Sequence, residues 1–274
     1  MCEHLAGSGL NPPSPVRSAA VQADLLFDPF GGRWEDLRDA ALLAEESGFD
    51  GVWLYDHLAG SVHRASHVLE CWTVLSALAA VVPQLAIGSL VLNVANRDAG
   101  TLGVMAATLQ EVAGGRLMLG VGAGGGAATP YAAEQLALGR PVPGDATRRA
   151  AVESTIATLR EVWSGTAGGI GGFLEPSPPP PVIVGGFGPK MSELAGRLGD
   201  GINAPPGASL PRLLDIAREA HAAVGRNPDE LIVTTSGSPG DDRLIRLGVD
   251  RVITMVRPPY TESVGHLART IGQR

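Results

Sequence analysis

Aromatic residues are scarce in this sequence, and positive charge is not in surplus. Phe, Trp and Tyr together make up 4% of the 274 residues, which argues against a surface on which nucleobases stack. The 21 Lys and Arg residues are outnumbered by 28 Asp and Glu, so the formal net charge is -7. Neither nucleic acid nor an anionic membrane surface is therefore expected as a partner.

Cysteine and long apolar runs are also scarce. Cys2 and Cys71 offer no disulfide framework and no CxxC pair, which is typical of the reducing cytoplasm. Residues 1–18 are polar and rich in turn formers, so we expect an N-terminal extension there rather than a signal peptide. The most apolar window, residues 74–95, is interrupted at Pro83 and predicts a helix followed by a strand rather than a membrane span.

What the sequence does contain is a repeated alternation of apolar extended runs and amphipathic helices. Strands are expected at residues 19–27, 51–55, 85–94, 115–124, 181–186, 200–203, 230–236 and 250–256. Strands that are apolar on both faces suit a parallel sheet covered by helices. Eight strand–helix units favour a single α/β domain over residues 19–274, a closed (β/α)₈ TIM barrel, over an open doubly wound sheet.

Two segments interrupt this alternation. Residues 122–145 form an extended loop after the fourth strand, at the end of the barrel where such enzymes keep their sites, and we interpret it as a lid. Residues 164–181 are rich in Gly and Pro and lead into the fifth strand, so they are expected at the opposite end, mainly as a linker.

The stretch GFDGVWLYDHL, residues 48–58, ends an apolar strand on two titratable side chains, Asp56 and His57. In a barrel this position faces the ligand, and histidine titrates near working pH, so the pair is predicted to be catalytic. Alternatively, Asp56 caps the following loop and His57 is an interior histidine with satisfied hydrogen bonds. His63 and His67 follow in a segment that lacks the Glu of zinc hydrolase helices, and no metal site is expected.

A second motif, IVGGFGPKMSELAGRLGDG, places glycines between a strand and a helix. The residues at this junction are Gly185, Gly186, Phe187 and Gly188. Glycine lets the backbone approach a ligand, and the start of a helix offers free N–H groups, so the motif predicts a phosphate site to which Lys190 adds charge. A glycine-rich turn without a ligand is the alternative.

Five stretches, taken in order, resemble the bacterial luciferase-like superfamily of flavin and deazaflavin oxidoreductases. They are GFDGVWLYDHL, CWTVLSALAAVVPQLAIGSLVLN, AATLQEVAGGRLMLGVGAG, PVIVGGFGPKMSELAGRLGDGIN and the helix end LREVW. The resemblance covers roughly residues 19–203, and its most specific parts are GGRLMLGVGAG and GRLGDGIN. The DH pair and GSLVLN are most similar to the branch that uses the deazaflavin coenzyme F420.

The resemblance implies a TIM barrel whose cofactor ring lies over the carboxyl ends of the strands. It implies that Asp56 contacts the cofactor and that His57 lies beside the reacting carbon. A non-proline cis peptide between Leu90 and Val91 would form a bulge behind the ring. The other implied cofactor-binding residues are Gly122, Ala123 and the phosphate-site residues Gly185, Gly186, Phe187 and Gly188.

The implied activity is transfer of a hydride between F420 and a small organic substrate, with His57 as proton donor or acceptor. An FMN-dependent monooxygenase and a non-catalytic flavin-binding barrel are the alternatives. Some deazaflavin relatives carry an acidic glutamate just beyond the fourth strand, where this sequence has Gly125 and Gly126, and its next acid is Glu134. Because related barrels often pair, a homodimer is also expected.

Overall fold

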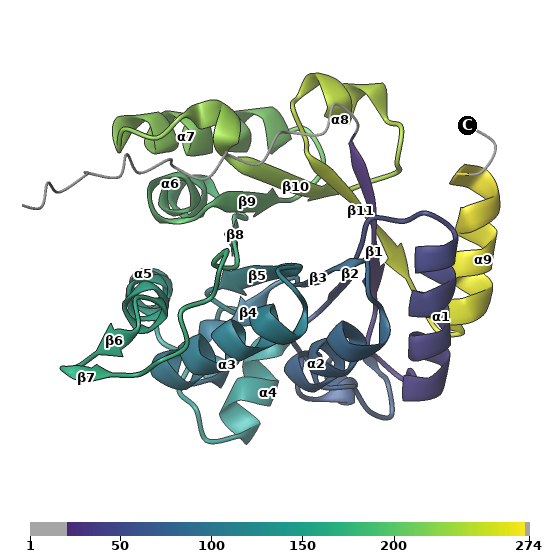
Figure 1. Cartoon of the computed structure of the whole chain (residues 1–274), viewed down its shortest axis with the longest axis horizontal. Coiled ribbons are helices and arrows are strands. Elements are labelled where there is room, and N and C mark those ends of the chain that lie inside the picture. The colour runs from purple at the N-terminus through teal and green to yellow at the C-terminus, as the bar shows by residue number, and fades with distance from the viewer. Residues whose placement is uncertain (1–20, 272–274) are drawn as a thin grey trace, which may run out of the picture.

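The computed structural model describes residues 21–271 and contains the expected closed barrel (Figure 1). The predicted extension, residues 1–18, lies outside the described residues. Within them, nine strands form one sheet in the order β3-β2-β1-β11-β10-β9-β8-β5-β4, and pairing of β3 with β5 closes it. The strands are β1 Gln22–Phe27, β2 Gly51–Leu54, β3 Ala86–Ser89, β4 Leu92–Asn93, β5 Leu117–Gly122, β8 Val182–Gly185, β9 Gly201–Ala204, β10 Ile232–Ser236 and β11 Arg251–Val256.

The expected third strand, residues 85–94, is divided into β3 and β4. Both pair with β5, β3 through Ile87 and Leu117 and β4 through Leu92 and Val121, so they are two parts of one barrel strand. The division falls at the peptide bond between Leu90 and Val91, which is cis. With β3 and β4 counted together, the barrel has eight parallel strands.

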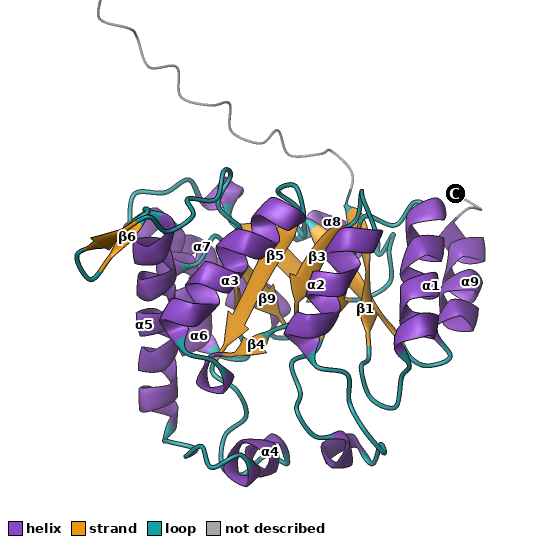
Figure 2. Ribbon diagram, turned by 60° about the horizontal axis from the view of Figure 1, so that its bottom comes forward, coloured by secondary structure: helices purple, strands orange, loops and turns teal. Residues whose placement is uncertain are grey.

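Helices surround the ring of strands (Figures 1 and 2). They are α1 Trp34–Glu46, α2 Cys71–Val81, α3 Ala99–Val112, α5 Asp145–Trp163, α6 Pro189–Leu198, α7 Leu210–Ala223, α8 Asp242–Arg246 and α9 Tyr260–Ile271. Side-chain caps start three of them: Glu70 accepts from the first turn of α2, Asp98 accepts from the N–H of Thr101 at 2.8 Å in α3, and Asp241 accepts from the N–H of Arg243 at 2.8 Å in α8. No helix among the described residues combines the length and apolarity that crossing a bilayer requires.

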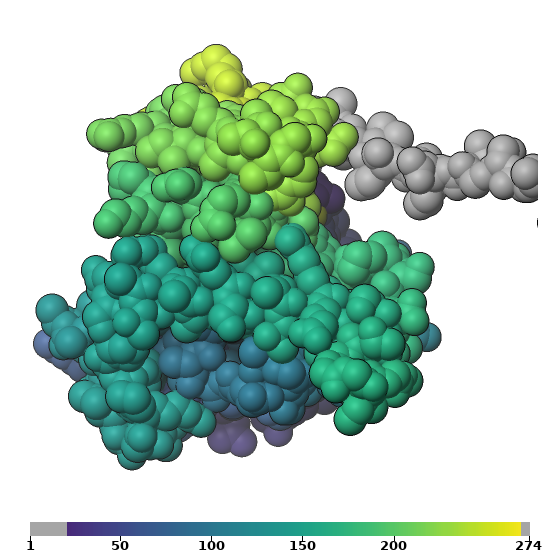
Figure 3. Space-filling model, turned by 90° about the vertical axis from the view of Figure 1, so that its left-hand side faces the viewer, coloured from purple at the N-terminus to yellow at the C-terminus, as the bar shows by residue number. Residues whose placement is uncertain are grey.

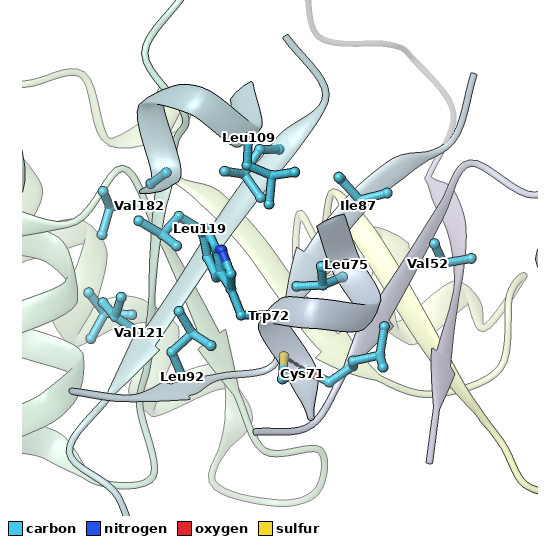
Figure 4. Packing of buried hydrophobic residues seen from close by; sticks show 14 of the residues in the cluster. Val52, Cys71, Trp72, Leu75, Ile87, Leu92, Leu109, Leu119, Val121 and Val182 are labelled. Carbon is cyan, nitrogen blue, oxygen red and sulfur yellow. Dashed lines mark hydrogen bonds between the residues drawn. The ribbon is translucent and has the colours of Figure 1, made fainter. Parts of the chain in front are cut away.

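Two hydrophobic layers hold the barrel together. Alternate residues of β2 divide between them, because successive side chains of a strand point to opposite faces. Val52 and Leu54 pack outward with the helices, in the layer of which Figure 4 shows a part. Trp53 points inward, where it packs with Leu26, Leu90, Ile183 and Ile253 and is fully buried.

The two segments that interrupt the alternation lie at opposite ends of the barrel. The extended loop after β5 contains a short helix, α4 Tyr131–Ala137, which lies beyond the tips of the strand arrows (Figure 2). The Gly- and Pro-rich segment forms a small hairpin, β6 Thr166–Ala167 and β7 Ile170–Gly171. Gln110 then ties this segment to the start of β5, since its side chain donates to the carbonyl of Pro178 and accepts from the N–H of Leu117.

Candidate functional site

The carboxyl ends of the strands surround one large cavity of about 1480 Å³. Residues from or just beyond all eight barrel strands line it, including Asp28 after β1, Tyr55 after β2 and Ser236 at the end of β10. This is the end of a TIM barrel at which active sites form. Of the site residues expected from the sequence, all except Gly186 line the cavity.

His57 forms a pair with Glu134, a residue contributed by α4. The Nδ1 atom of His57 lies 2.8 Å from Oε1 of Glu134. The other carboxylate oxygen accepts from the main-chain N–H groups of Leu58, at 2.8 Å, and Ala59, at 3.1 Å. Glu134 thereby joins the loop after β2 to the extended loop after β5, and its side chain is only 7% exposed.

The surroundings of Glu134 keep it ionised. Burial raises the pKa of this carboxyl, but hydrogen bonds from His57 and from the N–H groups of Leu58 and Ala59 outweigh burial, and the pKa lies below its usual value. An ionised carboxylate requires a proton on Nδ1 of the facing imidazole. With Nδ1 directed at Glu134, the other ring nitrogen, Nε2, has no hydrogen-bond partner within residues 21–271 and is left available for a ligand.

Aromatic rings enclose this imidazole. Phe30 and Tyr131 lie with their ring centroids 5.0 and 4.9 Å from that of His57. His63 packs against Phe30 at 4.3 Å, whereas the ring nitrogens of His67 bond to the side chain of the preceding serine and to a main-chain carbonyl. His57 and His63 thus share Phe30 and Tyr131 as neighbours, with ring centroids 5.7 Å apart, whereas His67 is held elsewhere, and the described residues contain no cluster of three or more potential metal ligands.

Asp56 is held by Arg97 and does not direct its carboxylate into the cavity. Arg97 donates to both carboxylate oxygens at 2.8 and 2.9 Å, and the N–H of Asn93 donates to one of them at 2.8 Å. The Asp56 side chain has no exposed surface. Burial lowers the pKa of Arg97, but Asp56 and Glu70 outweigh it and raise the pKa overall. The side chain of Asp56 thus fixes the end of β2 against β4, and only its main chain lines the cavity.

The bulge between β3 and β4 explains why glycines recur on the neighbouring strands. The side chain of Val91 fills the space that a Cβ atom would need on two of them: a Cβ on Gly122 would lie 2.5 Å from it and one on Gly185 2.9 Å, whereas a Cβ on Gly120 would meet the carbonyl oxygen of Ser89 at 1.9 Å. Real Cβ atoms do not approach so closely. Gly122 and Gly185 therefore accommodate Val91 at the cavity wall, a reason that sequence reasoning did not find.

The junction between β8 and α6 is open to the cavity and offers free donors. A Cβ on Gly188 would meet nothing within 4 Å, and Phe187 is 81% exposed. Within the described residues, no acceptor is found for the main-chain N–H groups of Phe187, Gly188 and Lys190. Gly186 has a different role, because it has no positive φ and a Cβ there would lie 3.1 Å from Ile202. The three free N–H groups form a nest of the kind that binds phosphate.

Comparison with known proteins agrees with this architecture. The family model described as luciferase-like monooxygenase matches residues 14–239. The chain is 29% identical over 234 residues to an F420-dependent glucose-6-phosphate dehydrogenase of Nakamurella multipartita, covering 80% of this chain and 66% of that protein. It is 30% identical over 199 residues to a 5,10-methylenetetrahydromethanopterin reductase of Methanolobus tindarius, covering 70% of this chain and 57% of that protein. The matches thus span less than two thirds of each relative's length.

Solved structures with low sequence identity share the fold. An F420-dependent secondary alcohol dehydrogenase in complex with an F420-acetone adduct superposes with a TM-score of 0.78 at 17% identity, covering 92% of this chain and 98% of that one. The coenzyme F420-dependent tetrahydromethanopterin reductase of Methanopyrus kandleri gives 0.72 at 15% identity, covering 91% and 98%. The barrel, the position of its cavity and the match over residues 14–239 lead to one conclusion: this chain belongs to the luciferase-like monooxygenase family.

Proposed function

We propose that this protein is an oxidoreductase that transfers a hydride between coenzyme F420 and a small organic substrate. The observation that carries the proposal is the His57–Glu134 pair, a buried carboxylate and a partly buried imidazole that meet at the edge of the cavity. On another part of the cavity wall, the free N–H groups of Phe187, Gly188 and Lys190 suit a phosphate. The F420-dependent relatives named above add support.

The cavity has the features that a deazaflavin needs. Leu90 and Val91 give it an apolar wall, next to the main chain of Gly122 and Ala123, on which a flat ring can lie. The nest after β8 is open, so a phosphate can reach it without moving a side chain. When bound, F420 supplies a ring carbon that accepts or gives up a hydride.

In this proposal the protein handles the proton. When an alcohol loses a hydride to become a carbonyl, its hydroxyl proton must leave as well, and Nε2 of His57 is the base available to take it. Glu134 stabilises the imidazolium that results and fixes the ring orientation. In the reverse direction, the same imidazolium protonates the oxygen of a carbonyl. Phe30 and Tyr131 help to exclude water from this position.

The substrate class that fits this arrangement is an alcohol and its carbonyl counterpart, since a single base next to the hydride acceptor completes the reaction. Polar groups near His57 are available to hold the rest of the molecule. They include Asp28, Tyr55, Arg64 and Arg257. These groups suit a polar substrate better than a hydrocarbon.

An FMN-dependent monooxygenase is the second candidate, because the matching family is named for such enzymes and the same nest suits the phosphate of FMN. Titration of the purified protein with each cofactor separates the two. We expect F420 to bind with micromolar or tighter affinity, and a panel of alcohols, aldehydes, imines and enones then identifies turnover. Binding of FMN but not F420 would replace the proposal with the monooxygenase. Binding without turnover across the panel would favour a non-catalytic barrel.

We also propose a cytoplasmic homodimer. Cys71 is a buried free thiol, as is usual in a reducing compartment. The helix α3 exposes Val104 by 42% and Val112 by 54%, which gives a partner an apolar surface to cover. Light scattering over a range of concentrations tests this part of the proposal, and a concentration-independent monomer would contradict it.

A further inference from the structure

Three cations gather at the edge of the cavity, between the starts of α5 and α6. They are Arg148 and Arg149 on α5 and Lys190, the only lysine of the sequence, on α6. The two helices contact each other, and Figure 3 views this side of the molecule, with α5 in teal below α6 and α7 in green. One carboxylate, Asp145, lies among the three, 2.8 Å from Arg148. The cluster is therefore cationic on a chain whose net charge is -7.

One of the cations, Lys190, occupies a position that helices normally leave to acids, and the other two follow closely after the first acid of α5, Asp145. Lys190 is the second residue of α6, and Arg148 and Arg149 are the fourth and fifth of α5. The amino end of a helix carries partial positive charge, so a cation there is destabilising unless an anion is nearby. Two such helix starts with three cations make a strongly positive region, and local rules of this kind are broken mainly at functional sites.

Arg148 is fixed in place and the other two are not. Its guanidinium donates to the carbonyls of Ala123 and Gly124 and to Asp145, while its buried Nε has no partner among the described residues. Arg149 and Lys190 lie within electrostatic reach of Asp145, and all three cations lower the pKa of this carboxyl, led by the hydrogen bond from Arg148. Neither Arg149 nor Lys190 makes a contact ion pair with a described carboxylate. Two cations are thus available to a ligand.

We propose that Arg149 and Lys190, supported by Arg148, form a carboxylate subsite next to the phosphate nest, and that it binds the acidic tail of the coenzyme. The proposal rests on the proposed function. F420 carries glutamate residues beyond its phosphodiester, whereas FMN ends at its phosphate, so the subsite would select between them. A guanidinium binds a carboxylate through two parallel hydrogen bonds, which suits Arg149 to this ligand.

The direct test compares forms of the coenzyme that differ only in the tail. Fluorescence titrations use F420 with its glutamates, the form trimmed back to the phospholactyl group, and the deazaflavin riboside without phosphate. At low salt we expect the glutamates to tighten binding by about tenfold, as one charge-assisted contact does, and this gain to shrink as salt is added. Arg149→Gln should remove most of the gain and leave the affinity of the trimmed form unchanged. Arg148 is not substituted, because it also holds the loop after β5.

Arg212→Gln is the matched control. Arg212 also lies in the first turn of a barrel helix, α7, and is exposed, but it does not line the cavity. It should keep the full gain from the glutamates. The tail is overturned as the ligand of the subsite if it brings no gain to the wild type, and the role of Arg149 is overturned if Arg149→Gln weakens all three forms alike. If none of the three binds, the proposed function itself fails.

A second readout does not depend on the deazaflavin. Because Lys190 is the only lysine, an amine-reactive label followed by mass spectrometry reports on this position alone, apart from the chain terminus. At low salt, citrate should slow the labelling of Lys190 in the wild type and in Arg212→Gln. In Arg149→Gln, citrate should slow this labelling much less. No protection by citrate would overturn the subsite whatever the cofactor is. If citrate protects Lys190 but the glutamates of F420 do not tighten binding, the coenzyme tail is not the ligand of the subsite, and an acidic substrate is favoured instead.

Discussion

At the scale of single residues, the sequence predicted one half of the central pair and not the other. His57 could be found because it ends a buried strand, and the ends of barrel strands have a known place in the fold. Its partner Glu134 lies 77 residues further along the chain. No local spacing connects them, because the contact exists only after the barrel closes and the extended loop folds back over the strand ends.

Replacing His57 by alanine separates catalysis from binding. If Nε2 takes the proton, His57→Ala should lower turnover by roughly 10²–10⁴-fold, the range for a positioned acid–base group, and leave F420 affinity near normal. Steady-state rates and fluorescence titration measure the two effects. His67→Ala is the control, because His67 is on the same loop and does not line the cavity. Turnover at the wild-type rate in His57→Ala would remove this residue from the mechanism.

Replacing Glu134 by glutamine keeps the shape of the pair and removes its charge. A glutamine NH₂ group can donate to Nδ1, which then gives up its own proton and moves it to Nε2, where a base is needed. We expect turnover to fall by roughly 10–100-fold, as for other groups that orient a histidine, with little change in cofactor affinity. Nitrogen NMR of the histidine rings reports the tautomer directly. An unchanged tautomer with unchanged turnover would show that the pair is only structural.

The same substitution has a distinct pH signature in stability. The pKa of Glu134 is lowered in the folded protein from the ordinary value of 4.5, because hydrogen bonds to the carboxylate outweigh burial. Ionised Glu134 therefore stabilises the fold fully above that ordinary value, and the contribution is lost as the pH falls through the lower folded-state pKa. Denaturant unfolding of wild type and Glu134→Gln should give free energies that differ most near neutral pH and converge in acid. A difference that stays constant with pH would contradict this account.

At the scale of elements, the strands lie close to the ranges expected from the sequence, and two elements are informative exceptions. The third strand was predicted as continuous, but it breaks at Leu90 and Val91 because Val91 turns into a socket of glycines on β5 and β8. Periodicity cannot reveal such a socket, since its walls come from other strands. The helix α4 was missed for another reason: it has seven residues and lies between Gly- and Pro-rich stretches that are typical of loops.

The socket predicts a strong coupling between two positions. Gly122→Ala places a methyl group 2.5 Å from Val91, so it should destabilise the protein by about 1–3 kcal/mol and weaken cofactor binding. Val91→Ala removes the opposing methyl groups. In the double variant much of the loss should be recovered, giving a coupling energy of about 1 kcal/mol or more in urea unfolding. Additive losses would mean that the two side chains do not compete for the same space.

At the scale of the whole molecule, the count of eight strand–helix units was sufficient to predict the barrel. What it could not predict is how the first and last strands are joined. Arg251 on β11 donates to both carboxylate oxygens of Asp24 on β1, and Trp53 donates to the same carboxylate at 2.7 Å. All three side chains are buried. Arg251 and Asp24 are 227 residues apart in the sequence, so no local sequence pattern predicts the contact that joins the two strands.

Breaking this closure should unfold the protein without touching the site. Asp24→Ala leaves the guanidinium of Arg251 buried and unpaired, which costs about 3–5 kcal/mol in comparable pairs. Replacing both residues by apolar ones, Asp24→Leu with Arg251→Met, should restore most of that stability. Urea denaturation followed by tryptophan fluorescence measures both. A double variant as unstable as the single one would show that packing at the base of the barrel, and not the unpaired charge, sets the cost.

The position of Glu134 on the extended loop makes the chemistry of this barrel separable from its scaffold. His57 lies in the loop directly after strand β2, while its partner Glu134 is contributed by a separate segment, residues 123–144, that adds no strand to the barrel. Exchange of that one segment between related barrels would transfer or delete the partner of the histidine as a unit. Natural divergence and laboratory recombination can therefore change the partner of His57 by exchanging this one segment, while the eight-stranded barrel is inherited unchanged.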